Sequence, residues 1–251
     1  CARLGWAASY VGSFGGDEFG AVSRQSLVDE GIDVSQARTV AGATNEFAVI
    51  LVDARNADRT ILWDRHPALT MRPDQVPATA VTSGRMLLVD ALEVGATAEA
   101  ARLARAAGIP TVLDAEVVRP GVEELLRHID AMIVAEAFPV ALTGYEQLGR
   151  ALEAMAREYQ APVVCTTLGE SGSLAYCGGR EIRTPAFPLT AVDTTGAGDA
   201  FRGGFIAGCL LDPHGQVDDV LRYANAVAGL NCRALGARTA LPRRGDVDAL
   251  L

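Results

Sequence analysis

From Met86 onward, short apolar runs alternate with segments whose apolar residues recur at helical spacing. This alternation is typical of repeated βα units and predicts a doubly wound, mainly parallel sheet with helices on both faces. The predicted strands span 86–89, 111–113, 131–134 and 163–166. The predicted helices span 96–107, 121–128, 138–142, 146–159, 197–211 and 217–232, with 233–242 looping back. Ligands of such sheets gather beyond the carboxyl ends of the strands, so the loops there are expected to face a binding site.

The first part of the chain lacks this alternation. Residues 1–5 look like the last turn of a helix that ends at a glycine, which predicts that a further segment precedes them. We expect a strand at 7–11, a glycine-rich loop at 12–17 and a helix at 18–30. Asp17 stands directly before that helix and is interpreted as its N-cap.

Two apolar runs at 47–52 and 59–63 flank a turn-rich segment, which predicts a β-hairpin. The first run is apolar at every position, so both of its faces must be covered. A hairpin that leaves the main domain would place one face over a ligand and the other against a second subunit. A central core strand would satisfy the same pattern.

Composition narrows the class of protein. A chain of 251 residues suits one α/β domain over 1–251, with the hairpin at about 45–65 as an appendage. The 22 Lys and Arg residues against 31 Asp and Glu give a net charge of −9 without a basic cluster, which argues against nucleic acid as a partner. The five cysteines form no CxxC pair, which favours a reducing cytoplasm. The sequence shows neither an apolar run of membrane-spanning length nor a signal peptide.

The most informative stretch is 193–201, Asp-Thr-Thr-Gly-Ala-Gly-Asp-Ala-Phe. Gly196 and Gly198 allow a sharp turn where a helical pattern begins, and the unpaired amides of a helix start can hold a phosphate or an oxyanion. A carboxylate at Asp199 would repel a phosphate unless it faces the other reactant, so Asp199 is interpreted as a base. The alternative is an ordinary glycine-rich turn with an aspartate near a helix N-terminus.

The whole string resembles the C-terminal signature of the ribokinase-like (PfkB) carbohydrate kinases. The resemblance implies ATP-dependent phosphorylation of a hydroxyl of a small sugar or polyol. It also implies that Asp199 is the catalytic base and contacts the substrate, while Gly196, Ala197 and Gly198 contribute the amides of an anion hole. Similar kinases carry a lid in the position of the predicted hairpin that covers the sugar and often pairs in a homodimer.

A second loop follows the predicted strand that ends at 166. It reads Thr-Leu-Gly-Glu-Ser-Gly over 167–172 and resembles the family's ATP-contacting loop, which implies nucleotide contacts from Thr167, Gly169 and Gly172. Asn225 matches a helix region that flanks adenine in relatives. A buried asparagine that bonds to the backbone is the alternative for that residue.

The resemblance further implies bound cations. A monovalent cation, potassium, would lie beside the anion hole, with ligands from Asp193, Thr195, Asn231, Ala234 and Gly236. Magnesium would accompany ATP, but the family's Asn-x-x-Glu motif is replaced here by Ala135 and Phe138.

This departure keeps other functions open. Ketohexokinase-like members also lack the glutamate, and Asp114-Ala115-Glu116 is similar to their Asp-x-Glu, which favours a ketose-type sugar. A solvated loop is the alternative for this acid pair. A nucleoside kinase and a catalytically silent nucleotide-binding regulatory protein are the alternatives. The family's first strand and its sugar-binding motif have no match after Cys1, which again predicts an upstream segment.

Overall fold

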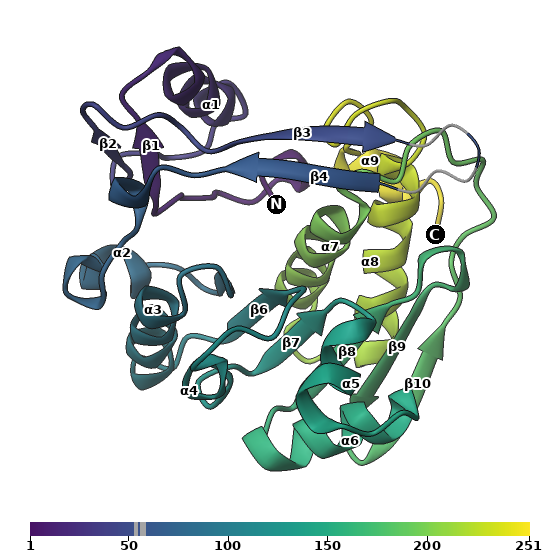
Figure 1. Ribbon diagram of the computed structural model, residues 1–251. Coiled ribbons are helices and arrows are strands. Elements are labelled where there is room, and N and C mark those ends of the chain that lie inside the picture. Colours follow the sequence, from purple (N-terminus) through teal and green to yellow (C-terminus); the bar gives the residue numbers. More distant parts are fainter. Residues whose placement is uncertain (53–54, 56–58) are drawn as a thin grey trace.

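A computed structural model describes residues 1–52, 55 and 59–251. A six-stranded sheet in the order β10-β9-β8-β7-β6-β5 forms its centre (Figure 1). Strands β5 to β8 are parallel, and β9 and β10 continue the sheet antiparallel. The strand bounds are β5 Leu87–Asp90, β6 Thr111–Ala115, β7 Ala131–Val134, β8 Val163–Thr167, β9 Ser173–Cys177 and β10 Arg180–Thr184. The predicted α/β sheet is confirmed, although the β9–β10 pair was not expected.

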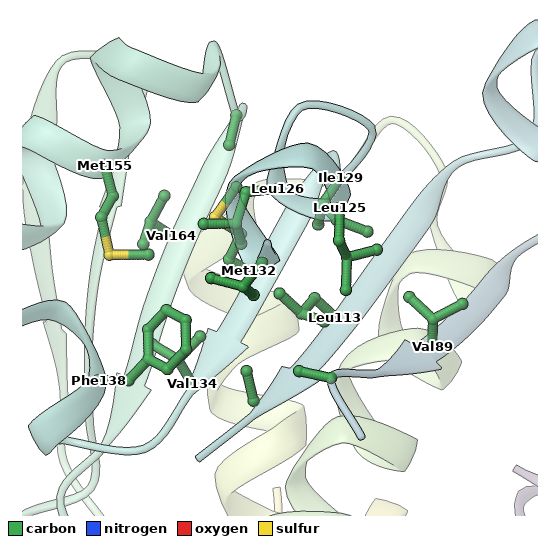
Figure 2. Packing of buried hydrophobic residues seen from close by; sticks show 14 of the residues in the cluster. Val89, Leu113, Leu125, Leu126, Ile129, Met132, Val134, Phe138, Met155 and Val164 are labelled. Carbon is green, nitrogen blue, oxygen red and sulfur yellow. The ribbon is translucent and has the colours of Figure 1, made fainter. Parts of the chain in front are cut away.

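Helices cover both faces of this sheet because the side chains along each strand alternate between two buried clusters. Leu113, Met132 and Val164 point into the larger cluster, which α3 to α6 complete (Figure 2). Val112, Ile133 and Cys165 point to the opposite face and pack on α7 and α8. The helices are α3 Val94–Ala106, α4 Val122–Leu126, α5 Ala137–Thr143, α6 Leu148–Tyr159, α7 Ala197–Leu211 and α8 Val217–Asn231. Among the described residues, no helix is both long and apolar enough to cross a membrane.

The N-terminal part corrects one prediction. The expected strand at 7–11 is wrong, because only Ser9 there forms an isolated bridge, to Asp33. The strand lies instead in the expected loop, where β1 (Ser13–Gly15) pairs in parallel with β2 (Arg38–Val40). A remote side chain supports it, since the buried Asn45 Oδ1 accepts a 2.9 Å hydrogen bond from the Gly15 amide. Helix α1 (Glu18–Asp29) follows the expected range, and Asp17 caps it by accepting from the Gly20 amide.

The predicted hairpin is confirmed as a separate two-stranded sheet, β3 (Phe47–Val52) and β4 (Arg59–Asp64) (Figure 1). Its turn falls mostly outside the described residues. The remaining elements are short, and most were not expected from the sequence. They are the single turns η1 Ala2–Leu4, η2 Pro67–Leu69, η3 Pro73–Gln75 and η4 Gly169–Ser171, and the helices α2 Ala78–Val81 and α9 Arg244–Asp248.

Candidate active site

The start of α7 has the sharp turn that the sequence predicts. Gly196 is the N-cap residue and has a left-handed backbone, with φ 75°. A Cβ at this position would lie 2.8 Å from the Ala237 carbonyl oxygen, so only glycine fits against the 236–237 loop. The Asp193 carboxylate ties the same two loops together, because it accepts from the Thr195 amide at 2.9 Å and from the Gly236 amide at 2.8 Å.

The first turn of α7 carries both an acid and amide donors. The Ala197 amide donates to the Thr194 carbonyl at 3.1 Å, so this member of the predicted anion hole is already hydrogen-bonded. The amides of Gly198 and Asp199 are in the first turn, where the helix itself provides no carbonyl acceptor. The Asp199 side chain is 79% exposed. The turn can therefore meet an anion with its amides and a hydroxyl group with its carboxylate.

A buried arginine lies beneath this turn. Arg202 is only 5% exposed, and its Nη2 lies 2.6 Å from Asp114 Oδ1 at the carboxyl end of β6. Its Nε donates to the Ile133 carbonyl of β7 at 3.3 Å, and its Nη1 lies 3.9 Å from Asp199 Oδ1. These contacts join the start of α7 to the edge of the sheet where the parallel strands end.

Asp114 lies in a strongly acidic environment. Burial raises its pKa from 3.8 to about 6, Arg202 opposes this rise, and the negative charges of Asp199, Glu116 and Asp90 add to it. Beside it is a hollow of about 260 Å³, lined by Asp90–Leu92, Asp114–Val117 and Arg119. A cavity of this size beyond the strand ends is a suitable acceptor pocket, and Arg202 links its lining residue Asp114 to Asp199.

The predicted nucleotide loop follows β8. Thr167 ends that strand, and Gly169 and Gly172 begin and end the tight turn after it. Gly172 has φ 87°, and a Cβ there would lie 2.1 Å from the Thr184 carbonyl oxygen, so the loop packs directly on the end of β10. Asn225 is behind the loop, where its Nδ2 donates to Ser173 Oγ at 3.1 Å and to the Thr184 carbonyl at 3.3 Å. These bonds favour the structural alternative for Asn225.

The residues expected to hold cations differ in how well they fit. Asn231 is fully buried, its Nδ2 donates to the Thr195 carbonyl at 3.4 Å, and its Oδ1 has no hydrogen-bond partner among the described residues. An orphaned buried oxygen beside a carbonyl suits a cation that prefers oxygen ligands. Ala135 and Phe138 offer magnesium no ligand, and Phe138 belongs to the buried core. No group of three or more acidic, His or Cys side chains among the described residues forms a metal site.

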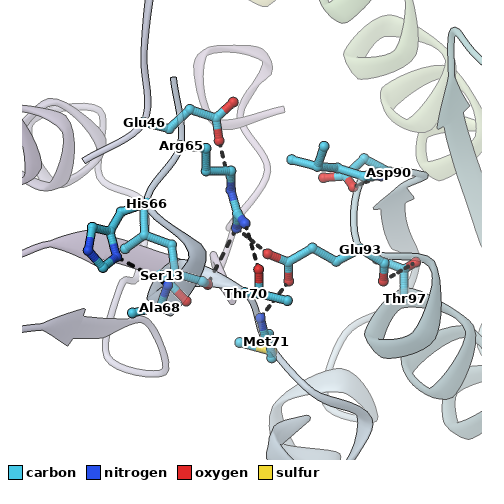
Figure 3. A network of polar contacts seen from close by, with 12 residues as sticks. Ser13, Glu46, Arg65, His66, Ala68, Thr70, Met71, Asp90, Glu93 and Thr97 are labelled. Carbon is cyan, nitrogen blue, oxygen red and sulfur yellow. Dashed lines mark hydrogen bonds and ion pairs between the residues drawn. The ribbon is translucent and has the colours of Figure 1, made fainter. Parts of the chain in front are cut away.

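The base of the hairpin is joined to the same edge of the sheet (Figure 3). Arg65, directly after β4, pairs with Glu93 at the start of α3 and with Glu46 at 2.9 Å. Glu93 also accepts from the Met71 amide at 2.9 Å. Because Glu93 closely follows Asp90, the hairpin starts next to the acidic hollow.

Two residues of this arrangement were not singled out from the sequence. Arg202 stood in the signature string without a role, and its signal was a charged residue on a helix of small and apolar neighbours. Arg65 gave no comparable signal, because its two acidic partners are distant in the sequence.

Comparison with known proteins identifies the family of the chain. The model of the pfkB family carbohydrate kinases matches residues 1–244, and the chain belongs to that family. It is 29% identical to a fructokinase of Klebsiella pneumoniae over all of this chain and 88% of that protein. A putative ribokinase from Agrobacterium tumefaciens matches with a TM-score of 0.89 and 25% identity, over 98% of this chain and 81% of that one.

A ribokinase of Arabidopsis thaliana, solved with ribose and ATP, matches with a TM-score of 0.85 and 26% identity, over 99% of this chain and 83% of that one. These relatives confirm the predicted family and fold. They support the predicted class of activity, phosphorylation of a sugar by ATP, over the nucleoside-kinase and silent alternatives.

Proposed function

We propose that this protein transfers the γ-phosphoryl group of ATP to a hydroxyl of a small sugar, with Asp199 as the base. The observation that carries the proposal is the exposed Asp199 carboxylate in the same helical turn as the Gly198 and Asp199 amides. Arg202 links this turn to Asp114, which lines the acidic hollow. The sugar oxygen forms a bond to the γ-phosphorus while the bond to the bridging β-phosphate oxygen breaks. ADP leaves with that electron pair, and the hydroxyl proton passes to Asp199.

The backbone amides at the start of α7 meet the charge that develops on the transferring group. Gly196 sets their direction through its left-handed turn, and Ala197 stabilises that turn through its bond to Thr194. Most of the acceleration then comes from alignment and charge stabilisation rather than from the strength of the base.

The adenine nucleotide is proposed to lie along the loop at 167–172, with contacts from Thr167, Gly169 and Gly172. The closely packed backbone of this loop supports that role, since Gly172 leaves no room for a side chain on the β10 side. Asn225 acts by holding Ser173 and the end of β10 in place. Magnesium arrives with ATP and supplies positive charge to the phosphates, and we assign it no protein ligand.

Potassium is proposed to bind beside the anion hole, with oxygen ligands from Asp193, Thr195, Asn231, Ala234 and Gly236. The unpartnered Asn231 Oδ1 supports this site. The exposed apolar hairpin supports a homodimer that pairs through β3 and β4. The lack of a CxxC pair among the five cysteines supports a cytoplasmic location.

The test is a screen of sugars and nucleosides at fixed ATP with ADP release as the readout. Turnover of a sugar, with a ketose such as fructose expected to rank high, supports the proposal. Turnover of nucleosides alone assigns the rival kinase activity, and ATP binding without turnover of any acceptor assigns the silent class.

A further inference from the structure

The phosphoryl transfer proposed above gives no role to Arg202, although this residue lies at the candidate site. It is at the i+3 position from Asp199 on α7, and its guanidinium extends under the anion-hole turn. A Cβ added at Gly198 would lie 2.8 Å from Arg202 Nη1, so the guanidinium is directly under that glycine. It also touches Asp114 on β6 and the Ile133 carbonyl on β7. One buried side chain therefore contacts three parts of the candidate site.

The charges around Arg202 make its removal costly. Asp114 is faced by Asp90 from β5, by Glu116 from its own loop and by Asp199 from α7, all of which raise its pKa, while Arg202 lowers it. Only 24% of the Asp114 side chain is exposed, so solvent screens these repulsions weakly. A planar guanidinium can meet two carboxylates and a carbonyl at once, which an ammonium group cannot do from one position.

We propose that Arg202 is a positioning residue for the phosphoryl transfer, because its buried guanidinium spans Asp114 and Asp199 and holds the proton-accepting carboxylate at the acceptor pocket. This inference rests on the proposed function. Asp114 fixes the guanidinium from the sheet side at 2.6 Å, and the looser 3.9 Å approach to Asp199 leaves that carboxylate free to take the hydroxyl proton. The positive charge thereby draws the Asp199 carboxylate towards the sheet although its side chain is 79% exposed.

The kinetic test compares Arg202→Met and Arg202→Lys with wild type on the sugar that the screen identifies. Arg202→Met is expected to lower kcat by roughly 10²-fold, the size of a misplaced reacting group, with the KM for ATP nearly unchanged. Arg202→Lys should recover part of kcat, because it restores one of the contacts. Arg180→Met is the matched control, since Arg180 forms an exposed ion pair with Asp218 away from the site.

Loss of folding is separated from loss of positioning by the double variant Asp114→Asn with Arg202→Met. It removes both buried charges together, so its thermal stability should recover towards wild type while kcat stays low. If kcat recovers along with stability, Arg202 is only a structural residue and the proposal is overturned.

A second measurement needs no turnover. Carboxyl NMR follows the pKa of Asp114 in wild type, Asp199→Asn and Arg202→Met. The pKa should fall below about 6 in Asp199→Asn and rise above it in Arg202→Met, because Asp199 and Arg202 act on Asp114 in opposite directions. An unchanged pKa in both variants overturns the coupling, whereas failure of every sugar in the screen overturns the proposed function and leaves this coupling standing.

Discussion

Strands β7 and β3 have nearly the same pattern and opposite environments. All four residues of β7, Ala131–Val134, are buried, because helices pack on both faces of the sheet. In β3, Phe47, Val49, Ile50 and Leu51 are apolar as well, yet each is between 43% and 55% exposed. An apolar run therefore indicates that other apolar groups must pack on both faces of the strand. It does not indicate whether the same chain provides those groups. We call the six-stranded sheet with its helices the sheet half and the hairpin of β3 and β4 the hairpin half. The inner strands of the sheet half are covered by helices of the same chain, although Leu88 on the edge strand β5 is 45% exposed, and the hairpin half lacks such a cover.

The two halves are also expected to divide the work, with the transfer chemistry in the sheet half and acceptor cover and subunit pairing in the hairpin. The junction between them is the Arg65 cluster with Glu46 and Glu93, beside the acidic hollow. Variants placed in one half or the other can test this division.

The largest effect is expected from Asp199→Asn in the sheet half. The substitution keeps the size of the side chain and removes the proton acceptor, so kcat should fall by on the order of 10² to 10⁴ while ATP binding is largely retained. Steady-state kinetics and ATP titration measure the two quantities. Asp219→Asn, an exposed acid in the first turn of α8, is the matched control. Near-normal turnover of Asp199→Asn would contradict the assignment of Asp199 as the base.

The structure of the sheet half was also the more predictable from the sequence. Helix α7 has the expected bounds 197–211, because it follows from local apolar periodicity and a glycine start. Strand β7 has the expected bounds 131–134, because it is a short continuous apolar run. Strand β1 could not be predicted in this way, since its support comes from Asn45, a side chain remote in the sequence. The β9–β10 pair and α9 were missed for a similar reason, as tertiary contacts rather than a long periodic pattern define them.

The same limit applies to the candidate site. The signature string indicated Asp199 and the glycines before it, because that chemistry resides in contiguous residues. The Arg202 contacts with Asp114 and Ile133 join residues 69 or more positions apart along the chain, and no local pattern encodes such a pairing. Asn225 stays a prediction as a nucleotide contact, and its hydrogen bonds inside the fold match the structural alternative that the sequence left open.

A second prediction concerns the free energy of unfolding and its dependence on the buried carboxyl group of Asp114. The pKa of Asp114 is raised from 3.8 to about 6, so the folded state holds its proton more tightly than the unfolded state does. Stability from this group is therefore greatest below about pH 4 and falls as the pH rises to about 6, by about 3 kcal/mol for a shift of this size. Asp114→Asn removes this dependence.

Urea unfolding of wild type and Asp114→Asn at several pH values between 4 and 7 measures the difference. Relative to wild type, the variant should gain stability across this range, whatever its offset at pH 4. A difference that stays constant from pH 4 to 7 would show that Asp114 does not titrate there.

The hairpin half allows a smaller and more selective effect. Directly opposed residues share a face, so Val49 and Leu62 mark one face, and Ile50 and Ile61 mark the other. One face is expected to contact the second subunit, so lysine at both of its positions should give a monomer. The other face is expected to cover the sugar, so lysine at both of its positions should raise the sugar KM about ten-fold, which corresponds to about 1.4 kcal/mol. The kcat of both should exceed that of Asp199→Asn.

Light scattering and sugar titration separate these outcomes. Val22→Lys, on the exposed side of α1, is the control for adding charge at an apolar surface position. If both hairpin variants keep the wild-type mass and the wild-type KM, the hairpin is neither a lid nor a dimer contact, and its exposed face has another cause.

The smallest effect is expected from the monovalent cation, and it tests the division between the halves directly. The proposed ligands around Asp193 and Asn231 belong to the sheet half, where Asp193 already ties the 193–195 loop to Gly236. Replacing sodium with potassium at matched ionic strength should raise kcat modestly, because the ion would steady the anion-hole turn.

Asn231→Leu should abolish this response by removing the unpartnered Oδ1, while Asn231→Asp, which keeps an oxygen there, should retain it. The hairpin variants should respond to potassium as wild type does, since none of the proposed ligands belongs to the hairpin. Equal kcat values for wild type in the two salts would contradict the proposed cation site. Loss of the potassium response in the hairpin variants would show that the two halves do not act separately.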